Sequence, residues 1–278
     1  MTLAALTILV ILLAAGGFAH ELAPQGWNSI DLSPRWQNHP PAFANGNVFG
    51  TDNLGRSILV RTLWGLHFSE QVAVVGALLA TTVGVMIGVL AGYYGGVSDS
   101  VLMPFADLVG GFPVIILMLI VFAFLRPVTI WDATLVFAFS LWALVARVVR
   151  AKIASIRSQE FVEAARALGA SDLRIIVRHV LPNASGVIVV ALTSLVGQIV
   201  IIDATVEFFG FGVDSSLRPT LGNLIANASA TGIGVFNEVS LGWWAWGTPA
   251  LVLVLLLVSI NLAGDGFEAA LDPRRRAA

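Results

Sequence analysis

The composition of this chain is that of a membrane protein. Hydrophobic residues make up 57% and charged residues 12% of its 278 residues, whereas soluble globular domains are about half apolar and about a quarter charged. The net charge of −2 provides no basic field and argues against a nucleic-acid partner. Cysteine is absent, which excludes disulfides and thiolate chemistry, and the four histidines have no helical ligand spacing that would favour a metal site.

Six apolar segments approach the length of a transmembrane helix, which needs about 20 apolar residues to cross a bilayer core. They are Thr2 to Ala19, Val72 to Gly92, Val101 to Leu125, Thr129 to Ala146, Gly186 to Asp203 and Thr248 to Leu262. The first has no basic n-region before it, so we interpret it as a retained helix and not as a signal peptide. Pro113 should bend the third. We therefore predict an all-α membrane protein with one transmembrane domain over residues 1–278.

Lys and Arg residues indicate the orientation of these segments. Ten of them lie in the connection that follows the fourth segment and in the C-terminal tail, and five lie elsewhere. Because cytoplasmic connections carry the excess of basic residues, both termini are predicted to be cytoplasmic. The predicted external segments are 20–71 and 204–247, and the cytoplasmic ones are 147–184 and 264–278.

Small residues recur every four positions along the second segment, at Gly76, Ala80, Gly84, Gly88 and Gly92. Such residues let helix backbones approach closely inside a membrane. We call this face the small-residue stripe and predict that it packs within the chain. A seam with a second subunit is the alternative.

The basic connection predicts two short helices. Residues 159–168 are helix formers, and Gly169 can adopt the left-handed conformation that ends a helix. Ser171 stands where an N-cap belongs, with Asp172 in the first turn, so a second helix should run until Pro182 stops it. On these grounds alone an inert amphipathic connection is equally possible.

The same connection resembles the EAA loop of ATP-binding-cassette (ABC) importer permeases. A Glu-Ala-Ala triplet is followed after three residues by glycine, and after nine more by His-x-Leu-Pro, an ending similar to the peptide and nickel branch. The matching positions are Glu163, Ala164, Ala165, Gly169, His179, Leu181 and Pro182.

Three further stretches are similar to the C-type permease subunit of the dipeptide, oligopeptide and nickel importers. Residues 50–56 match its Gly-Thr-Asp-x-x-Gly-Arg, residues 207–213 are similar to its Leu-Ser-Phe-Leu-Gly-Leu-Gly-Val stretch, and residues 261–274 match its ending. Ser57 departs from the family, which usually has an acidic residue there. The usual polar leader is also missing, so the start lies upstream or this member lacks a leader. Asp52 and Arg56 are expected to fold the external connection through capping and backbone hydrogen bonds.

The resemblance implies a type I ABC importer permease fold with six transmembrane helices. It implies a pathway for di- or oligopeptides, shared with a homologous B-type permease and opened alternately to each side; nickel, glutathione and haem are alternatives within the family. The other implied partners are two ABC ATPase subunits, which bind ATP and Mg, an extracytoplasmic solute-binding protein and membrane lipid. By this analogy the EAA residues couple the ATPase to a multi-pass permease of a bacterial or archaeal cytoplasmic (inner) membrane.

The chain is not predicted to be an enzyme on its own. A P-loop needs a lysine after its second glycine, but the only lysine, Lys152, follows an alanine. No cofactor or metal site is expected in this chain.

An ion-coupled secondary transporter is the rival interpretation, because acidic residues within a membrane usually have a functional role. Asp107, Asp132, Asp203 and Glu207 lie in or near predicted spans, but none is clearly at the midplane. No inverted repeat with paired broken helices is apparent. Sensitivity of uptake to vanadate or to ionophores would separate the two mechanisms.

Overall fold

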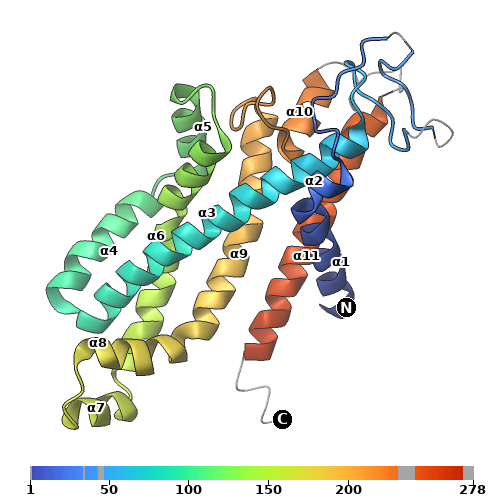
Figure 1. The fold of residues 1–278 in the computed structure, drawn as a ribbon. Coiled ribbons are helices and arrows are strands. Elements are labelled where there is room, and N and C mark those ends of the chain that lie inside the picture. Colours follow the sequence, from blue (N-terminus) through green and yellow to red (C-terminus); the bar gives the residue numbers. More distant parts are fainter. Residues whose placement is uncertain (1, 34, 43–46, 231–241, 272–278) are drawn as a thin grey trace.

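The computed structural model of the chain describes residues 2–33, 35–42, 47–230 and 242–271, and the regular elements in this part are all helices. They are α1 (Thr2–Gly17), α2 (Ala19–Leu22), α3 (Ile58–Tyr94), α4 (Gly96–Gly110), α5 (Val114–Phe124), α6 (Ile130–Arg157), α7 (Glu160–Ala167), α8 (Asp172–Ile175), a π-helical turn (Ile176–Val180), α9 (Leu181–Phe208), α10 (Leu221–Ala230) and α11 (Trp243–Leu271). Figure 1 shows an elongated bundle in which α3, α6, α9 and α11 run between the two ends of the molecule. The predicted all-α class is confirmed.

Four helices in the described part are long and apolar enough to cross a membrane: α3, α6, the continuous run Asp172–Phe208 and α11. The bent pair α4 and α5 would make five, and α1 is a shorter apolar helix of 16 residues. The predicted count of six spans and the sides of the termini therefore stay predictions.

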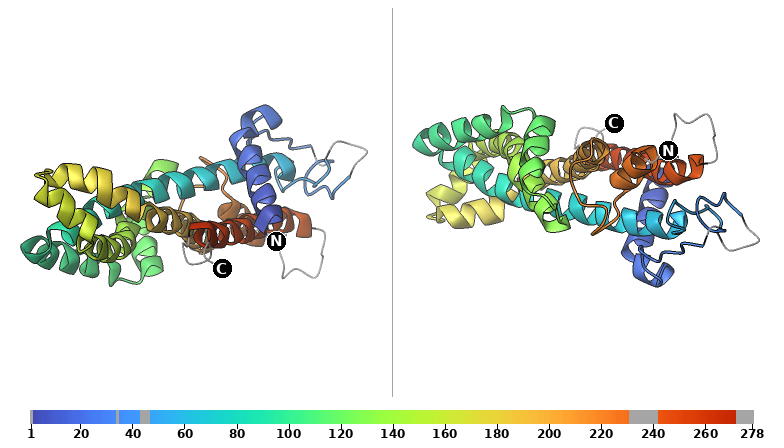
Figure 2. Two further views of the ribbon diagram at one scale, coloured as in Figure 1. Left: turned by 90° about the horizontal axis from the view of Figure 1, so that it is seen from below. Right: turned by 90° about the horizontal axis from the view of Figure 1, so that it is seen from above.

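Pro113 interrupts the third predicted span, as expected. The axes of α4 and α5 differ by 76° across a break that ends at Pro113, the residue before α5 begins. The α4 half is held on α6 by an ion pair between Asp99 and Arg150 and by the stacked rings of Phe105 and Trp142. Figure 2 shows α4 and α5 at one side of the bundle and α1 at the other.

The second predicted span begins much earlier than expected, because α3 starts at Ile58 and not near Val72. Polar residues at 61, 69 and 70 make this stretch look like part of an external loop, but all three are buried in the helix. Arg61 donates to Asp52 at 2.6 Å, and the hydroxyl of Ser69 accepts the backbone N–H of Leu221 at 3.0 Å. Residues 58–71 are therefore helical, and the predicted external position of segment 20–71 stays a prediction.

Pro182 does not end a helix, and this prediction is wrong. The helix that begins at Asp172 continues through Pro182 to Phe208. Proline normally breaks a helix because its ring clashes with the carbonyl four residues earlier and it has no N–H. Here the π-helical turn immediately precedes it, with the N–H of Leu181 donating to the carbonyl of Ile176, and the wider turn accommodates the ring.

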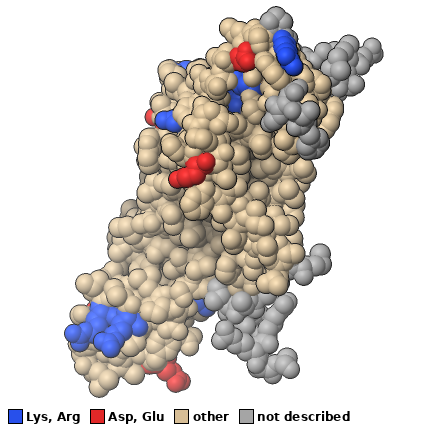
Figure 3. All heavy atoms as spheres, turned by 45° about the vertical axis from the view of Figure 1, so that its right-hand side comes forward, with Lys and Arg blue, Asp and Glu red and all other residues tan. Residues whose placement is uncertain are grey.

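The segments that connect the long helices lie at the two ends of the bundle. The turn from α6 to α9, with α7 and α8, lies at the lower end in Figure 1, and the irregular chain between α2 and α3 lies at the upper end with α10. On the face shown in Figure 3, Lys and Arg gather toward these ends while the broad middle is mostly uncharged. Residues 231–241 of the predicted segment 204–247 and residues 272–278 of the predicted tail lie outside the described part.

Candidate functional site

The EAA segment folds as a helix, a glycine turn and a second helix. Gly169 has φ of +81°, in the left-handed region predicted for it. Its N–H donates to the carbonyl of Arg166 at 3.0 Å, and the N–H of Ala170 donates to that of Ala165 at 3.1 Å. This is the pattern of a Schellman turn, in which glycine satisfies the last carbonyls of a helix. Ser171 occupies the N-cap position of α8, although its side chain makes no capping bond.

Helix α7 exposes one face and buries the other. Glu163 and Ala164 are exposed, Ala165 is half-buried, and Val162 is fully buried against the bundle. Leu168, at the end of α7, is 88% exposed and Phe161 is also exposed. Apolar side chains left open beside a carboxylate, at an end of the molecule away from the uncharged middle, form a surface suited to contact with another protein.

The remaining residues of the EAA pattern lie beyond the glycine turn, where the second helix continues into α9. His179 and Leu181 are half-buried and Pro182 is exposed. The carbonyl of His179 accepts the side-chain N–H of Asn183 at 2.6 Å, one residue after the proline. These residues shape the entry into α9, whereas the Glu-Ala-Ala triplet supplies the exposed surface of α7.

Tyr93 joins both halves of this segment to α3, a role that the sequence does not indicate. It lies on the last turn of α3 and is only 2% exposed. Its hydroxyl donates to Oδ1 of Asp172 at 2.7 Å and accepts from Nη2 of Arg166 at 3.4 Å. The hydrogen bond from Arg166 raises the pKa of that guanidinium. Arg157 adds a nearby bond, from Nη1 to the carbonyl of Tyr94, at 3.2 Å.

The small-residue stripe of α3 packs against α6 of the same chain. A Cβ at Gly84 would lie 2.6 Å from Cβ of Val145, and one at Gly88 would lie 2.7 Å from the carbonyl oxygen of Ala146. At Gly92 the carbonyl of Arg150 would be 2.7 Å away. Ala80 is fully buried, and Gly76 has room, with 3.4 Å to the nearest side chain, that of Ile199. The two backbones thus touch most closely toward the EAA end.

Asp52 organises the chain at the opposite end of the bundle. Its Oδ1 accepts the backbone N–H groups of Leu54 at 2.9 Å and Arg56 at 3.0 Å. Its Oδ2 accepts from the side chains of Arg56 at 2.8 Å and Arg61 at 2.6 Å. The expected folding role of Asp52 and Arg56 is confirmed, and the carboxylate also ties this connection to α3. Ser57 is the N-cap residue of α3 without a capping side-chain bond.

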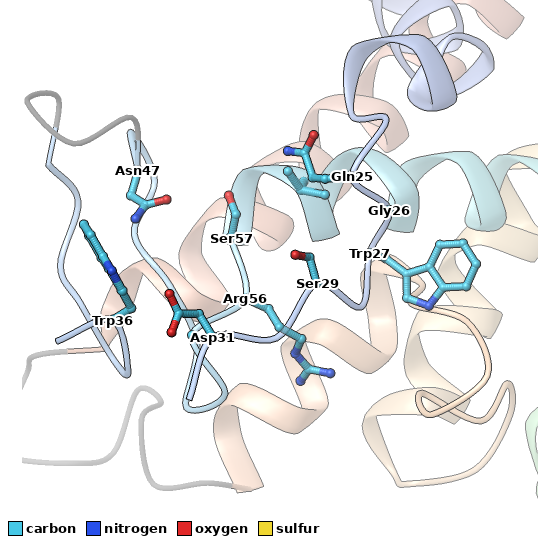
Figure 4. Close-up of a pocket in the computed structure, with 11 residues that line it drawn as sticks. Gln25, Gly26, Trp27, Ser29, Asp31, Trp36, Asn47, Arg56 and Ser57 are labelled. Atoms are coloured by element: carbon cyan, nitrogen blue, oxygen red, sulfur yellow. The ribbon is translucent and has the colours of Figure 1, made fainter. Parts of the chain in front are cut away.

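A pocket of about 230 Å³ opens beside this connection (Figure 4). Trp27 is held by edge contacts with the rings of Trp64 and Phe68. Hydrogen bonds from Ser33 lower the pKa of Asp31. The lining residues are Gln25, Gly26, Trp27, Ser29, Asp31, Trp36, Asn47, Gly55, Arg56, Ser57 and Val60. In Figure 4 the indole of Trp27 points away from Trp36 and Asp31, so the two indole rings do not face one another across the pocket.

Three of the four acidic residues that suggest an ion-coupled mechanism have structural partners, whereas Oδ1 of Asp203 is buried without a hydrogen-bond partner among the described residues. Asp132 forms a capping box with Thr129, and Asp107 lies 3.9 Å from Arg147. Glu207 is 1% exposed, and its Oε2 accepts from the hydroxyl of Thr220 at 2.6 Å and the N–H of Asn223 at 3.1 Å.

Glu207 thereby caps the N-terminus of α10, where a negative charge is favoured. It also contributes to the wall of a smaller cavity, of about 180 Å³, between the α5–α6 connection and the start of α10. Asp203 is buried one turn before it. Within the described residues no group of three or more acidic, histidine or cysteine side chains is placed to hold a metal ion.

Comparison with known proteins identifies the family. The profile of the binding-protein-dependent transport system inner membrane component matches residues 84–277. The chain is 33% identical to the oligopeptide transport system permease protein OppC of Mycobacterium tuberculosis, covering 98% of this chain and 90% of that protein. It is 31% identical to the dipeptide transport system permease protein DppC of Bacillus subtilis, covering 99% of this chain and 82% of that protein.

A solved structure agrees with the fold. A chain of the MetNI methionine ABC transporter in inward-facing conformations superposes with a TM-score of 0.60 at 21% identity, covering 77% of this chain and 96% of that one. The resemblance to C-type ABC importer permeases is confirmed, and the comparisons do not support the ion-coupled alternative. This is a multi-pass protein and a component of a transport system. The chain belongs to the family of inner membrane components of binding-protein-dependent transport systems.

Proposed function

We propose that this chain forms, together with a homologous B-type permease, the pathway through which an ATP-driven importer takes up di- or oligopeptides. The observation that carries the proposal is the similarity to OppC and DppC permeases, which extends over 98% and 99% of the chain. The names of those relatives favour peptides over nickel, glutathione or haem.

The EAA segment is the proposed contact with an ATPase subunit. Its Glu-Ala-Ala triplet lies on a short helix at one end of the bundle, beside the exposed side chains of Phe161 and Leu168. When two ATPase subunits close on ATP and Mg, displacement of α7 moves the helix that continues into α9 and shifts the pathway between its outward-open and inward-open states. The proposed coupling residues are Glu163, Ala164, Ala165, Gly169, His179, Leu181 and Pro182.

The solute arrives at the opposite end of the bundle. A solute-binding protein outside the cytoplasmic membrane of a bacterium or archaeon delivers the peptide to the end that carries Asp52 and α10. The pocket in Figure 4 lies on this proposed delivery face. The uncharged middle of the bundle contacts membrane lipid.

Transport in vesicles tests this proposal. The full complex is reconstituted with its binding protein, and accumulation of a radiolabelled dipeptide is followed in competition with unlabelled tripeptide, nickel, glutathione or haem. We expect the uptake to depend on ATP, to stop in vanadate and to be unchanged by an ionophore. Among the competitors, only peptides should reduce it. Uptake that an ionophore abolishes, or that nickel or haem displaces while peptides do not, would contradict it.

A matched pair of variants tests the assignment of α7. Glu163→Lys reverses the charge of the exposed triplet, whereas Lys152→Ala removes an exposed charge on α6, outside the triplet. We expect normal membrane abundance for both. Glu163→Lys should lose uptake and co-purify with less ATPase, and Lys152→Ala should retain both.

A further inference from the structure

We infer that Tyr93 is a positioning residue that fixes the angle between α7 and the helix that leads into α9, and so makes the EAA segment move with α3. This inference rests on the proposed function, because it takes α7 as the contact with the ATPase. The hydroxyl of Tyr93 is a bridge between Arg166 at the end of α7 and Asp172 at the start of α8.

The link between α7 and α8 is soft without this bridge. Four residues, 168–171, connect the two helices, and a Cβ added at Gly169 would meet no atom of the described residues within 4 Å beyond its chain neighbours. Glycine restricts the backbone less than any other residue. Val162 is the one fully buried side chain of α7, which leaves rotation of α7 about that contact possible, whereas α8 is the first turn of the continuous helix that runs to Phe208. The hydroxyl of Tyr93 contacts both helices and removes that freedom.

The charges at the bridge suit its place. Asp172 lies in the first turn of α8 and Arg166 in the last turn of α7, the ends at which a helix favours those signs. A neutral phenol between them donates to the carboxylate and accepts from the guanidinium, and hydrogen bonds with charged partners are the stronger kind. Both charged residues are exposed, so removing the hydroxyl leaves them hydrated and not buried without a partner.

Helix α3, which carries Tyr93, is itself closely packed against α6. In the last turns before Tyr93, the glycines at 84, 88 and 92 let α3 pack closely on α6, because a Cβ added at any of them would lie within 3 Å of an α6 atom. A push on α7 that is transmitted through Tyr93 therefore reaches the α3–α6 pair and not α9 alone. Loss of the bridge should uncouple the ATPase from the pathway while leaving the bundle intact.

The chain provides a matched control, because its two tyrosines are adjacent. Tyr93→Phe removes the bridging hydroxyl, and Tyr94→Phe removes an exposed one. Both are prepared in the full complex and compared for thermal stability, ATPase co-purification, ATP hydrolysis and peptide uptake. For Tyr93→Phe we expect stability and ATPase association close to wild type, and a fall in peptide taken up per ATP of about fivefold or more, the usual size of coupling between sites. Tyr94→Phe should match wild type.

A distance measurement reads the angle directly. The chain has no cysteine, so spin labels on Ala167→Cys and Val177→Cys, two exposed positions, with cysteine-free partner subunits, report the separation of α7 from the helix that leads into α9. The distribution should be narrow in wild type and broader in Tyr93→Phe. Asp172→Ala, which removes the acceptor at an exposed site, should broaden it likewise, and Asp172→Asn, which keeps an acceptor oxygen, should broaden it less.

Wild-type distances and a wild-type uptake ratio in Tyr93→Phe would overturn the inference. If Tyr93→Phe does not assemble, wild-type values in Asp172→Ala overturn it instead. The distances are recorded without any solute. A wild-type complex that takes up no peptide therefore refutes the proposed function alone, while an unchanged distribution refutes the role of Tyr93 alone.

Discussion

A single backbone conformation decides the shape of the EAA segment at the residue scale. Gly169 combines a positive φ with open space around its Cα, so a side chain there meets no steric obstacle beyond its own backbone. The cost of replacing it depends on how well the new residue tolerates the left-handed region. Substitutions at Gly169 therefore measure the effect of backbone strain without a loss of side-chain contacts.

We predict that Gly169→Val impairs transport and Gly169→Asn much less. A β-branched residue in the left-handed conformation costs about 1 to 2 kcal/mol, whereas asparagine adopts it readily. The measurement is uptake and ATP hydrolysis in vesicles, with membrane abundance as the control, which should be normal for both. Equal losses in the two variants would show that the open space, and not the conformation, is what coupling requires.

Close packing of two helices dominates the element scale. The small-residue stripe is not uniform: a methyl group would fit at Gly76 but would lie 2.7 Å from a carbonyl oxygen at Gly88. The sequence shows small residues at every fourth position but not this gradient, because the spacing to α6 depends on how the two helices cross.

We predict that Gly88→Ala lowers the thermal stability of the purified complex and Gly76→Ala does not. Extra volume in a packed interior costs about 1 to 3 kcal/mol when the neighbours cannot move, and backbone atoms are the neighbours here. Leu90→Ala, at an exposed position of the same helix, is the control and should be close to wild type. Identical melting temperatures for Gly88→Ala and Gly76→Ala would mean that α3 and α6 separate easily.

The sequence predicts the cores of the long helices better than their ends. Apolar runs locate parts of α3, α6, α9 and α11, and Pro113 locates the bend between α4 and α5. The start of α3 is missed because Arg61 and Ser69 look like loop residues until their partners, Asp52 and the backbone of Leu221, are known. The continuation through Pro182 depends on a π-helical turn that no residue pattern announces.

Part of the candidate site can also be predicted from the sequence, and part cannot. Gly169 and its turn follow from local chemistry, since only a few residues favour a positive φ. The bridging role of Tyr93 cannot be predicted from local chemistry, because Asp172 and Arg166 lie 79 and 73 residues away along the chain. A tyrosine at the end of an apolar helix looks like an ordinary interfacial residue.

At the scale of the whole molecule, the chain is one component of a transport system. It has a proposed contact surface for an ATPase at one end and a folded connection at the other. The only lysine, Lys152, is on α6 and is preceded by alanine, so no P-loop is present in the sequence.

We predict that the purified chain neither binds nor hydrolyses ATP and that hydrolysis requires its ATPase subunits. Equilibrium dialysis with labelled ATP and Mg should give no stoichiometric binding to the chain alone. The matched measurement on the full complex is the positive control. One nucleotide bound per isolated chain would refute this division of labour.

The length of α3 has a mechanical consequence. Thirty-seven residues at a rise of 1.5 Å make a rod of about 55 Å, well beyond the hydrocarbon core of about 30 Å. Tilting such a rod by about 10° carries one tip about 10 Å relative to the other, by the same rise per residue. Because the close contacts of its glycines with α6 lie near the Tyr93 tip, a tilt of α3 about those contacts moves the Ile58 tip farther than the Tyr93 tip.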